Sequence, residues 1–255
     1  MARGQKQVEG QISFNFCLEP SNYVVQSNEL INGKQALKLN SAKLIRSAIM
    51  QVVKEDAELK PYIVTIKELA KILNVPTSNI YRDIEGIVQD ILDHPVSFKR
   101  TDGKKEQWVK IPWYTRCEYH SDIGIALKLN PELEPYLINL KAHYTQYSLG
   151  EILAMKSVYA IRIFEMIQSR IMSRTVPLDG VHVVMSVQEI RECCDCEDKY
   201  PAFGNFKDKV IDAAAKEINR VTVYDLSYTY QKEGKKVTAI DFFIISKYSM
   251  RTIKG

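Results

Sequence analysis

The 255-residue sequence has no long hydrophobic run and no apolar segment at its amino end. Its apolar stretches fall well short of the roughly 20 residues that a helix needs to cross a bilayer. Met1–Gln7 is polar and basic, without the apolar core of a secretory signal. We therefore expect a soluble cytoplasmic protein with no membrane partner.

Cysteine is scarce and follows no spacing typical of a disulfide framework or a metal site. The odd count of five suits a reducing compartment. Cys193, Cys194 and Cys196 are clustered, but there is no CxxC pair, and the nearest fourth ligand, His182, lies beyond a helix-capping motif. We predict thiols that close a short helix, and neither a metal nor a cofactor.

Motifs of catalysis are also missing. No Gly-x-x-x-x-Gly-Lys-Ser/Thr run is present, which excludes a P-loop ATPase. The four histidines never form the His-hydrophobic-His pair that holds the metal of a rolling-circle nickase, and with 14 tyrosines no single one indicates a nucleophile. We therefore predict that the protein is not an enzyme.

Basic residues, in contrast, gather at two Gly-Lys-Lys turns. The net charge of +4 is modest, so the position of the charge is more informative than its total. Phe98–Lys110 holds five basic and two acidic residues, and Gln231–Lys236 holds three basic and one acidic. A solvated turn also carries lysines, but two such turns at equivalent hairpin tips favour an anionic partner.

A short unit occurs twice along the chain. Thr65 with Glu68, and Ser186 with Glu189, form Ser/Thr-x-x-Glu capping boxes, each of which follows a β-branched run and opens a short helix. A break, a longer amphipathic helix and two β-rich runs follow each box. Strand, helix, turn, helix and hairpin is the order of a winged helix. We predict an α+β protein made of two tandem winged-helix domains related by a pseudo-twofold axis.

The same pattern predicts the domains and their elements. Residues 1–20 are polar and unpatterned, which indicates a flexible arm. We expect the first domain at 21–146 and the second at 147–255, with a short joint near Tyr144–Tyr147 and no flexible linker. Further expected elements are a helix capped by Asn40-Ser41, a helix capped by Thr77 or Ser78, helices over 131–143, 149–172 and 206–220 (the last capped by Asn205), and a first wing of strands 96–99 and 107–113.

Three segments resemble one known family. Lys156-Ser-Val-Tyr-Ala-Ile-Arg-Ile-Phe-Glu-Met166 resembles the helix that opens the second winged-helix domain of iteron-binding plasmid replication initiators. Phe206-Lys-Asp-Lys-Val-Ile-Asp-Ala-Ala-Ala-Lys-Glu-Ile-Asn219 is similar to the recognition helix of that family, and Ser27-Asn-Glu-Leu-Ile31 to the start of its first domain. The resemblance covers roughly residues 22 to 245.

The resemblance implies a bacterial initiator that binds direct repeats in double-stranded origin DNA through two recognition helices. It also implies a monomer–dimer equilibrium, a dimer that binds an operator inverted repeat and represses its own promoter, and contacts with host replication initiation proteins and helicase.

Candidate DNA-binding residues follow from the two predicted recognition helices and hairpin tips. Lys or Arg can donate to guanine, Asp can accept from cytosine, and turn lysines can contact phosphate. The second-domain candidates are Lys207, Lys209, Asp212, Lys216, Arg220, Lys235 and Lys236. The first-domain candidates are Ser78, Asn79, Tyr81, Arg82, Lys99, Arg100, Lys104 and Lys105.

The first recognition helix turns acidic after its second turn, at Asp83, Glu85 and Asp90, so we expect it to contact DNA backbone more than bases. An ordinary solvated face with an Asp212–Lys216 pair is the alternative for the second helix. Three other functions remain open: a tandem winged-helix transcriptional regulator, a protein-interaction module and, less favoured, a metal-dependent origin nickase.

Overall fold

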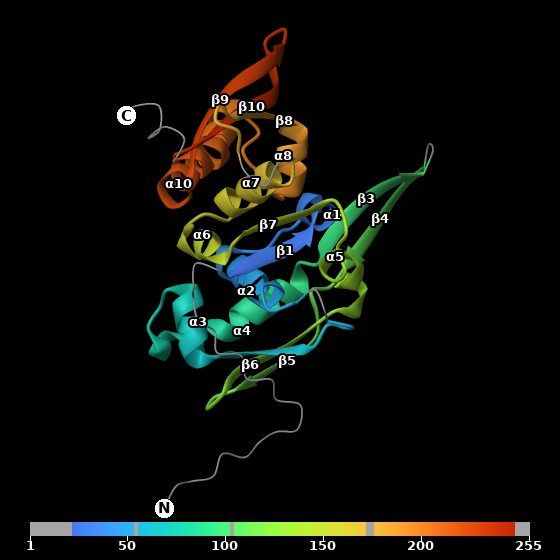
Figure 1. Ribbon diagram of the computed structural model, residues 1–255, viewed down its shortest axis with the longest axis vertical. Coiled ribbons are helices and arrows are strands. Elements are labelled where there is room, and N and C mark those ends of the chain that lie inside the picture. Colours follow the sequence, from blue (N-terminus) through green and yellow to red (C-terminus); the bar gives the residue numbers. More distant parts are fainter. Residues whose placement is uncertain (1–21, 54–55, 103–104, 172–175, 248–255) are drawn as a thin grey trace, which may run out of the picture.

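The computed structural model describes residues 22–53, 56–102, 105–171 and 176–247 (Figure 1). The first half contains β1 (Tyr23–Ser27), α1 (Asn28–Asn32), α2 (Leu39–Ile49), β2 (Pro61–Thr65), α3 (Ile66–Leu73), α4 (Thr77–Asp93), β3 (Val96–Asp102), β4 (Lys105–Ile111), β5 (Tyr114–His120), β6 (Gly124–Leu129), η1 (Pro131–Leu133) and α5 (Glu134–Leu137). The second half contains β7 (Tyr144–Ser148), α6 (Leu149–Ala154), α7 (Val158–Gln168), β8 (Val181–Ser186), α8 (Val187–Cys193), α9 (Phe203–Phe206), η2 (Lys207–Asp212), α10 (Ala213–Val221), β9 (Tyr224–Glu233) and β10 (Lys236–Ser246). None of the helices in these ranges is both long and apolar enough to span a membrane.

Both halves are winged helices, as predicted. Each runs through a strand, a short helix, a longer helix, a second strand, a short helix, a recognition helix and a hairpin. The three-stranded sheets have the same order, β2-β6-β5 and β8-β10-β9, in which the hairpin strand that comes second in the chain occupies the centre. The α+β class and the tandem arrangement are therefore confirmed.

The two halves are joined through a sheet of two strands. β1 pairs antiparallel with β7, so that Tyr23 lies opposite Ser148 and Ser27 opposite Tyr144. Both strands end in a serine that caps the next helix: Ser27 accepts from the backbone of Leu30, and Ser148 from that of Gly150. This pairing relates the start of each half by a local twofold. The expected joint near 144–147 lies inside β7.

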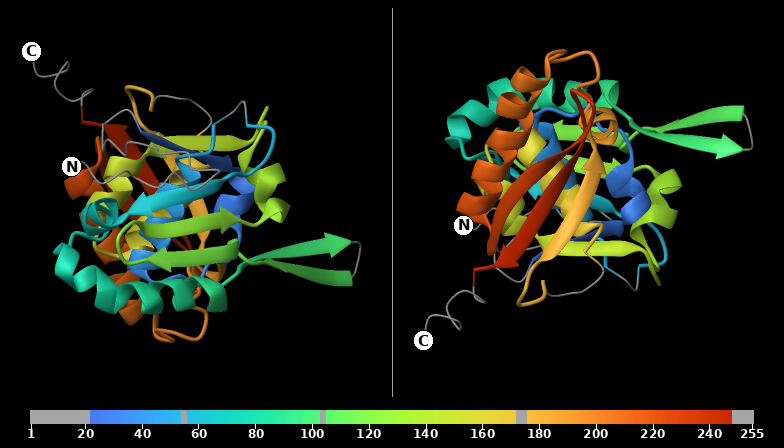
Figure 2. Two further views of the ribbon diagram at one scale, coloured as in Figure 1. Left: turned by 90° about the horizontal axis from the view of Figure 1, so that it is seen from below. Right: turned by 90° about the horizontal axis from the view of Figure 1, so that it is seen from above.

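The prediction for the first wing is wrong. β3 and β4 form a separate two-stranded ribbon that projects from the body (Figures 1 and 2). The hairpin that pairs with β2 is β5–β6, so this hairpin is the wing. The pattern of neighbouring residues predicts that a hairpin forms, but it does not predict which sheet the hairpin joins. Pairing with a further strand depends on residues that are distant in the sequence. The two basic turns are therefore not equivalent, and 98–110 lies in an insertion.

The helix expected over 149–172 is two helices, α6 and α7. Lys43 and Arg220 donate to the last carbonyls of α6 at 2.8 and 3.0 Å. Glu217 accepts from the backbone N–H groups just before α7. Cations at a helix C-terminus and a carboxylate at an N-terminus both oppose the local helix dipole. Side chains from other elements thus stabilise the break, and local periodicity does not reveal them.

Several expected helix ends also differ. The segment 131–143 is helical only as far as Leu137. α2 begins at Leu39, because the N–H of Lys38 donates to Asp90 of α4, so Asn40 and Ser41 lie inside the helix. α4 begins after Pro76 and α9 after Ala202, without side-chain caps from Thr77, Ser78 or Asn205. In these cases the helix starts earlier than the short polar residue that was expected to cap it.

The two capping boxes differ in completeness. Thr65 and Glu68 make both hydrogen bonds of the box, as predicted. Ser186 accepts from the N–H of Glu189, but the carboxylate of Glu189 pairs with Arg170, two residues after the end of α7. The second box is therefore only half formed, and its acid joins α8 to α7.

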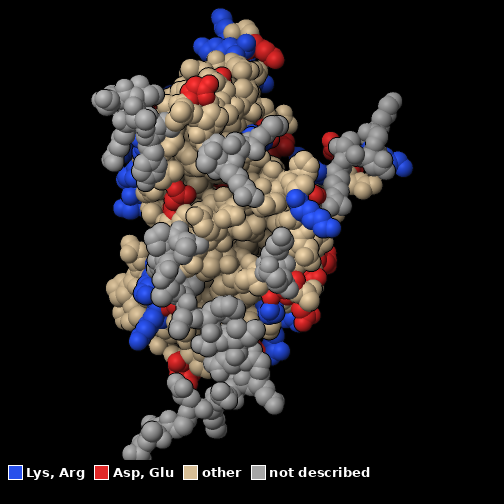
Figure 3. Space-filling view, viewed as in Figure 1, with Lys and Arg blue, Asp and Glu red and all other residues tan. Residues whose placement is uncertain are grey.

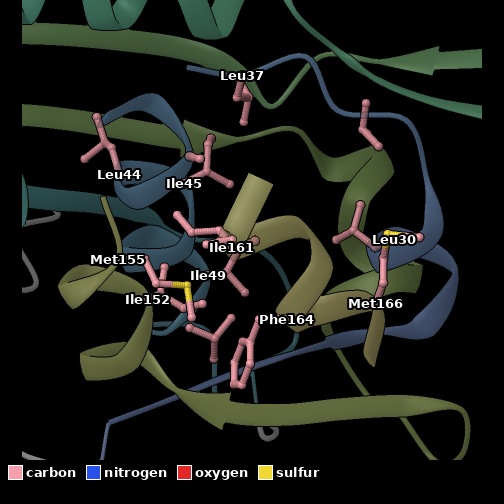
Figure 4. Packing of buried hydrophobic residues seen from close by; sticks show 14 of the residues in the cluster. Leu30, Leu37, Leu44, Ile45, Ile49, Ile152, Met155, Ile161, Phe164 and Met166 are labelled. Atoms are coloured by element: carbon pink, nitrogen blue, oxygen red, sulfur yellow. The ribbon is translucent and has the colours of Figure 1, made fainter. Parts of the chain in front are cut away.

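A single core runs through both halves. α2, α6 and α7 bring apolar side chains together, among them Ile45, Ile49, Ile152, Ile161 and Phe164 (Figure 4). The hydrophobic contact is continuous from the first domain into the second, which favours one fixed arrangement of the two.

A buried ion network lies within this joint. Arg46 of α2 and Arg162 of α7 each place a guanidinium nitrogen 2.8 Å from Oε2 of Glu165, and the three side chains are buried. Burial by itself would raise the pKa of the Glu165 carboxyl, but the two arginines lower it to about 2. Gln26 of β1 and Tyr147 of β7 also donate to this carboxylate.

Candidate nucleic-acid interface

The second recognition helix runs without interruption from Phe203 to Val221 through α9, η2 and α10. Its apolar face packs inward through Phe206, Val210, Ala214 and Ile218, which are all buried as expected from their spacing. The middle segment η2 is a π-helix, in which residues five apart are neighbours.

The π-helical turn changes which charges meet. Lys207 Nζ lies 2.5 Å from Oδ2 of Asp212, five residues later, and the hydroxyl of Tyr228 on β9 donates to the other oxygen of that carboxylate. Burial would raise the pKa of Asp212, but the donors Lys207 and Tyr228 bring it below the usual range. The alternative Asp212–Lys216 pair is replaced by this one, because an α-helical period does not hold across η2.

Lys209 and Lys216 are the exposed cations in the middle of this helix. Within the described part of the chain, neither side chain makes a hydrogen bond or an ion pair. Arg220, in the last turn, is also exposed but donates to the carbonyl of Ala154 at 3.0 Å. Of the helix candidates, Lys209 and Lys216 therefore have unengaged ammonium groups.

The residues that hold this helix in place were not singled out from the sequence. The Glu217 carboxylate accepts from the backbone N–H groups of Lys156 and Ser157 at 2.7 and 3.0 Å. The Asn219 side chain donates to the carbonyl of Leu226 and accepts from its N–H, which fastens the helix to β9. The Glu-Ile-Asn ending of the segment that resembles the initiator family thus has a structural role, and this resemblance was the signal available in the sequence.

The tip of the second wing carries exposed lysines. Glu233 pairs with Lys236 across a two-residue turn of Gly234 and Lys235, where glycine adopts a φ of +59°. Lys235 and Lys236 are exposed. Figure 3 shows Lys and Arg at this tip and along the side on which α10 and α3 lie in Figure 1. The recognition helix and the wing of this domain thus both present basic side chains.

In the first domain, α4 exposes its early polar residues. Ser78 and Arg82 are exposed, and Asn79 is half-buried. Arg82 Nε lies 2.9 Å from the neighbouring carboxylate of Asp83. Tyr81 is 51% exposed, and its hydroxyl donates to the carbonyl of Ser121 at the tip of the β5–β6 wing. Tyr81 therefore braces this wing against the helix.

The β3–β4 ribbon separates the remaining candidates. Lys99, halfway along it, forms an ion pair of 3.2 Å with Glu192 on α8 of the second domain. Lys105, near the tip, is exposed. Trp108 is 69% exposed, with Lys110 Nζ 5.3 Å from its ring centroid. The side chain of Arg100 and the whole of Lys104 lie outside the described residues.

The clustered cysteines take no part in this surface. Cys193, Cys194 and Cys196 are buried, and the thiol of Cys193 donates to the carbonyl of Asn32 in α1 at 3.1 Å. Burial raises the pKa of Cys196 to about 11. Across the described ranges, no group of three or more His, Cys, Asp or Glu side chains could hold a metal ion.

Fold and surface together define a tandem winged-helix protein that carries unengaged basic side chains on its second recognition helix and wing. Two family models match this chain: initiator replication protein WH1 over residues 23–168, and initiator Rep protein WH2 over residues 186–244. The chain belongs to this family of initiator replication proteins, as its sequence motifs predicted.

Two relatives and one solved structure are similar to this chain over most of its length. The PI protein of Escherichia coli is 25% identical over 226 residues, which are 80% of this chain and 72% of the relative. An uncharacterized 27.6 kDa protein of Escherichia coli is 24% identical over 229 residues, 85% of this chain and 93% of the relative. A crystal structure of the Pi initiator protein in complex with iteron DNA has a TM-score of 0.74 at 20% identity, and covers 90% of this chain and 99% of that one. The last match establishes the shared fold.

Proposed function

We propose that this protein initiates plasmid replication by binding direct repeats, or iterons, through both of its winged helices. The observation that carries the proposal is the pair of unengaged lysines, Lys209 and Lys216, on a helix that is fastened from behind by Glu217 and Asn219. A fixed helix that presents long cationic donors suits insertion into a major groove. Family membership and the Pi–iteron complex, which has the same fold, support the same function.

The roles within the surface follow from the contacts. Lys209 and Lys216 read bases, whereas Lys235 and Lys236 on the wing contact phosphate. Lys207 and Asp212 neutralise one another and orient the helix against β9. In the first domain, Ser78, Asn79 and Arg82 contact the backbone, and Lys105 on the ribbon adds a further phosphate contact.

We further propose that the protein is not an enzyme and that, besides iteron DNA, it has an operator repeat and host proteins as partners. A dimer formed through the first domain binds an operator inverted repeat and represses the promoter of the protein, and the monomer on iterons recruits host initiation proteins and helicase. The protein works in the bacterial cytoplasm. The domain division at 146/147 is part of this proposal.

A binding titration tests the function. Duplexes that carry direct repeats of about 20 base pairs from the DNA upstream of the gene are compared with scrambled duplexes at several salt concentrations. An initiator prefers the repeats, and its log K falls steeply with log salt. Equal binding to both duplexes removes the initiator function. Cleavage of the DNA with a divalent metal favours a nickase, and binding only to a promoter-proximal inverted repeat favours a transcriptional regulator.

A further inference from the structure

Each recognition helix carries a carboxylate that caps the long helix behind it. On α4, Asp90 accepts from the backbone N–H of Lys38 at 2.9 Å, at the start of α2. On α10, Glu217 accepts from the N–H groups of Lys156 and Ser157 at 2.7 and 3.0 Å, at the start of α7. The first N–H groups of a helix have no partner inside it, and a carboxylate there also complements the helix dipole. The same contact thus recurs in both domains.

The two long helices are in turn fastened to each other. Glu165 of α7 accepts from Nε and Nη2 of Arg46 on α2, at 2.9 and 2.8 Å, and from Nη1 of Arg162 at 2.8 Å. Arg162 Nη2 also donates to the carbonyl of Gly33, the C-cap of α1, at 2.9 Å. A guanidinium that grips both oxygens of a buried carboxylate allows one orientation of the pair.

These contacts form one continuous path between the recognition helices. It runs from α4 through Asp90 to α2, from α2 through Glu165 to α7, and from α7 through Glu217 to α10. Every step is a carboxylate on one helix whose partner lies on a neighbouring helix or directly before it. A packed apolar core lies around the central step (Figure 4). The distance and angle between α4 and α10 therefore depend on three side chains that do not face the proposed DNA surface.

We propose that Asp90, Glu165 and Glu217 are positioning residues that set the spacing of the two half-sites this protein accepts. The inference rests on the proposed function, in which both helices contact one DNA duplex. One inserted base pair displaces a half-site by about 3.4 Å and turns it by roughly 35°. A rigidly joined pair of domains cannot follow that change, whereas a loosely joined pair can.

The test measures spacing discrimination with the full-length protein. Wild type and Glu165→Gln are titrated against the natural repeat, the same repeat with one base pair inserted or removed at its centre, and a scrambled duplex. We expect wild type to lose on the order of tenfold or more in affinity on the respaced sites. Glu165→Gln should lose only about threefold or less, while still preferring the natural repeat to the scrambled duplex, because Lys209 and Lys216 are unchanged.

A matched control separates positioning from general loss of charge. Glu189→Gln removes the carboxylate of an ion pair with Arg170 that also reaches α7 but leads to no recognition helix. This variant should keep the wild-type spacing ratio. Glu217→Gln should relax the ratio as Glu165→Gln does, and because Glu217 is half-buried it carries the test if Glu165→Gln does not fold.

The outcomes are distinguishable. A folded Glu217→Gln or Glu165→Gln protein with the wild-type spacing ratio overturns the positioning role, even if its overall affinity falls. An equal relaxation in Glu189→Gln overturns it too, because any lost ion pair would then suffice. A wild-type protein that binds repeats and scrambled DNA alike overturns the proposed function instead.

Discussion

Helix α4 of the first domain and the α9–α10 helix of the second occupy equivalent places between a short helix and a wing, yet their outer faces differ. Beyond Arg82, α4 exposes the acidic residues Glu85 and Asp93, whereas the second helix exposes Lys209 and Lys216. Both are held from behind by a carboxylate cap on a long helix. The two domains thus share the arrangement of helices and the carboxylate cap, but the charge on the outer face of the recognition helix differs. This contrast supports base recognition by the second domain and backbone contact by the first.

The wings extend the same contrast. The tip of the second wing carries Lys235 and Lys236, while the turn of the first, between β5 and β6, carries Asp122. The basic β3–β4 ribbon is an addition to the first domain with no counterpart among the described residues of the second. Two domains with one topology can therefore divide positioning and readout between them.

The largest effect on stability should come from removing the Glu165 carboxylate, which joins the two halves. Glu165→Ala leaves two buried guanidiniums without their carboxylate, so we expect a loss of about 3–5 kcal/mol in the free energy of unfolding. Urea denaturation followed by circular dichroism measures it. Glu189→Ala, which breaks a partly exposed pair, should cost less than about 1 kcal/mol. Similar losses in both variants would contradict a special role for the joint.

The same carboxylate predicts a pH dependence. Glu165 has a pKa of about 2 in the folded protein, against about 4.3 in an unfolded chain. A depressed folded pKa gives stability that is complete above the unfolded value and is lost as the pH falls through the folded value, here about 3 kcal/mol. Unfolding free energies at pH 6 and pH 3 should therefore differ less in Glu165→Gln than in wild type. Equal changes in the free energy of unfolding with pH in wild type and Glu165→Gln would contradict this prediction.

The recognition helices can be compared directly by substitution. Lys209→Ala with Lys216→Ala should lower the preference for the repeat over scrambled DNA by about 1–3 kcal/mol per lysine. Ser78→Ala with Arg82→Ala, in α4, should weaken both duplexes equally. Fluorescence anisotropy titrations measure both constants. If the α4 variant lost the preference and the second-helix variant did not, the division of roles would be reversed.

The wing and the ribbon provide a smaller contrast. Lys235→Ala with Lys236→Ala should weaken all sequences alike and reduce the slope of log K against log salt by about 1.8, because each phosphate contact contributes about 0.9. Lys104→Ala with Lys105→Ala should change the slope less, because the ribbon to which Lys105 belongs is not the counterpart of the second wing. Equal changes in slope would indicate that the two Gly-Lys-Lys turns contact DNA phosphates in the same way.

The smallest effect is expected from the acidic face of α4. Glu85→Lys replaces an exposed negative charge with a positive one, so affinity should rise by no more than about tenfold at low salt, equally for repeat and scrambled duplexes. Binding at two salt concentrations is sufficient to measure it. An increase confined to the repeat would place this part of α4 in a base-reading position.

Much of the fold was predictable because its signals are local. The Thr65–Glu68 box formed as predicted. Asn74 ends α3 in the left-handed conformation that asparagine tolerates, and apolar residues at helical spacing are buried in the second recognition helix. The site was predictable only in outline. Lys209 and Lys216 are exposed, whereas Lys99 and Arg220 are held by contacts to other elements that lie far away in sequence.

The sequence by itself determined the order of elements, the tandem winged helices and the family, because capping, periodicity and short motifs depend on neighbouring residues. Only the tertiary structure decided which hairpin is the wing, where the helix over 149–172 breaks, and that Asp212 pairs with Lys207. It also decided that Glu165 and Glu217 join the two halves. Each of these depends on contacts between distant segments, or on a π-helical turn that shifts the helical period, and neither leaves a local pattern.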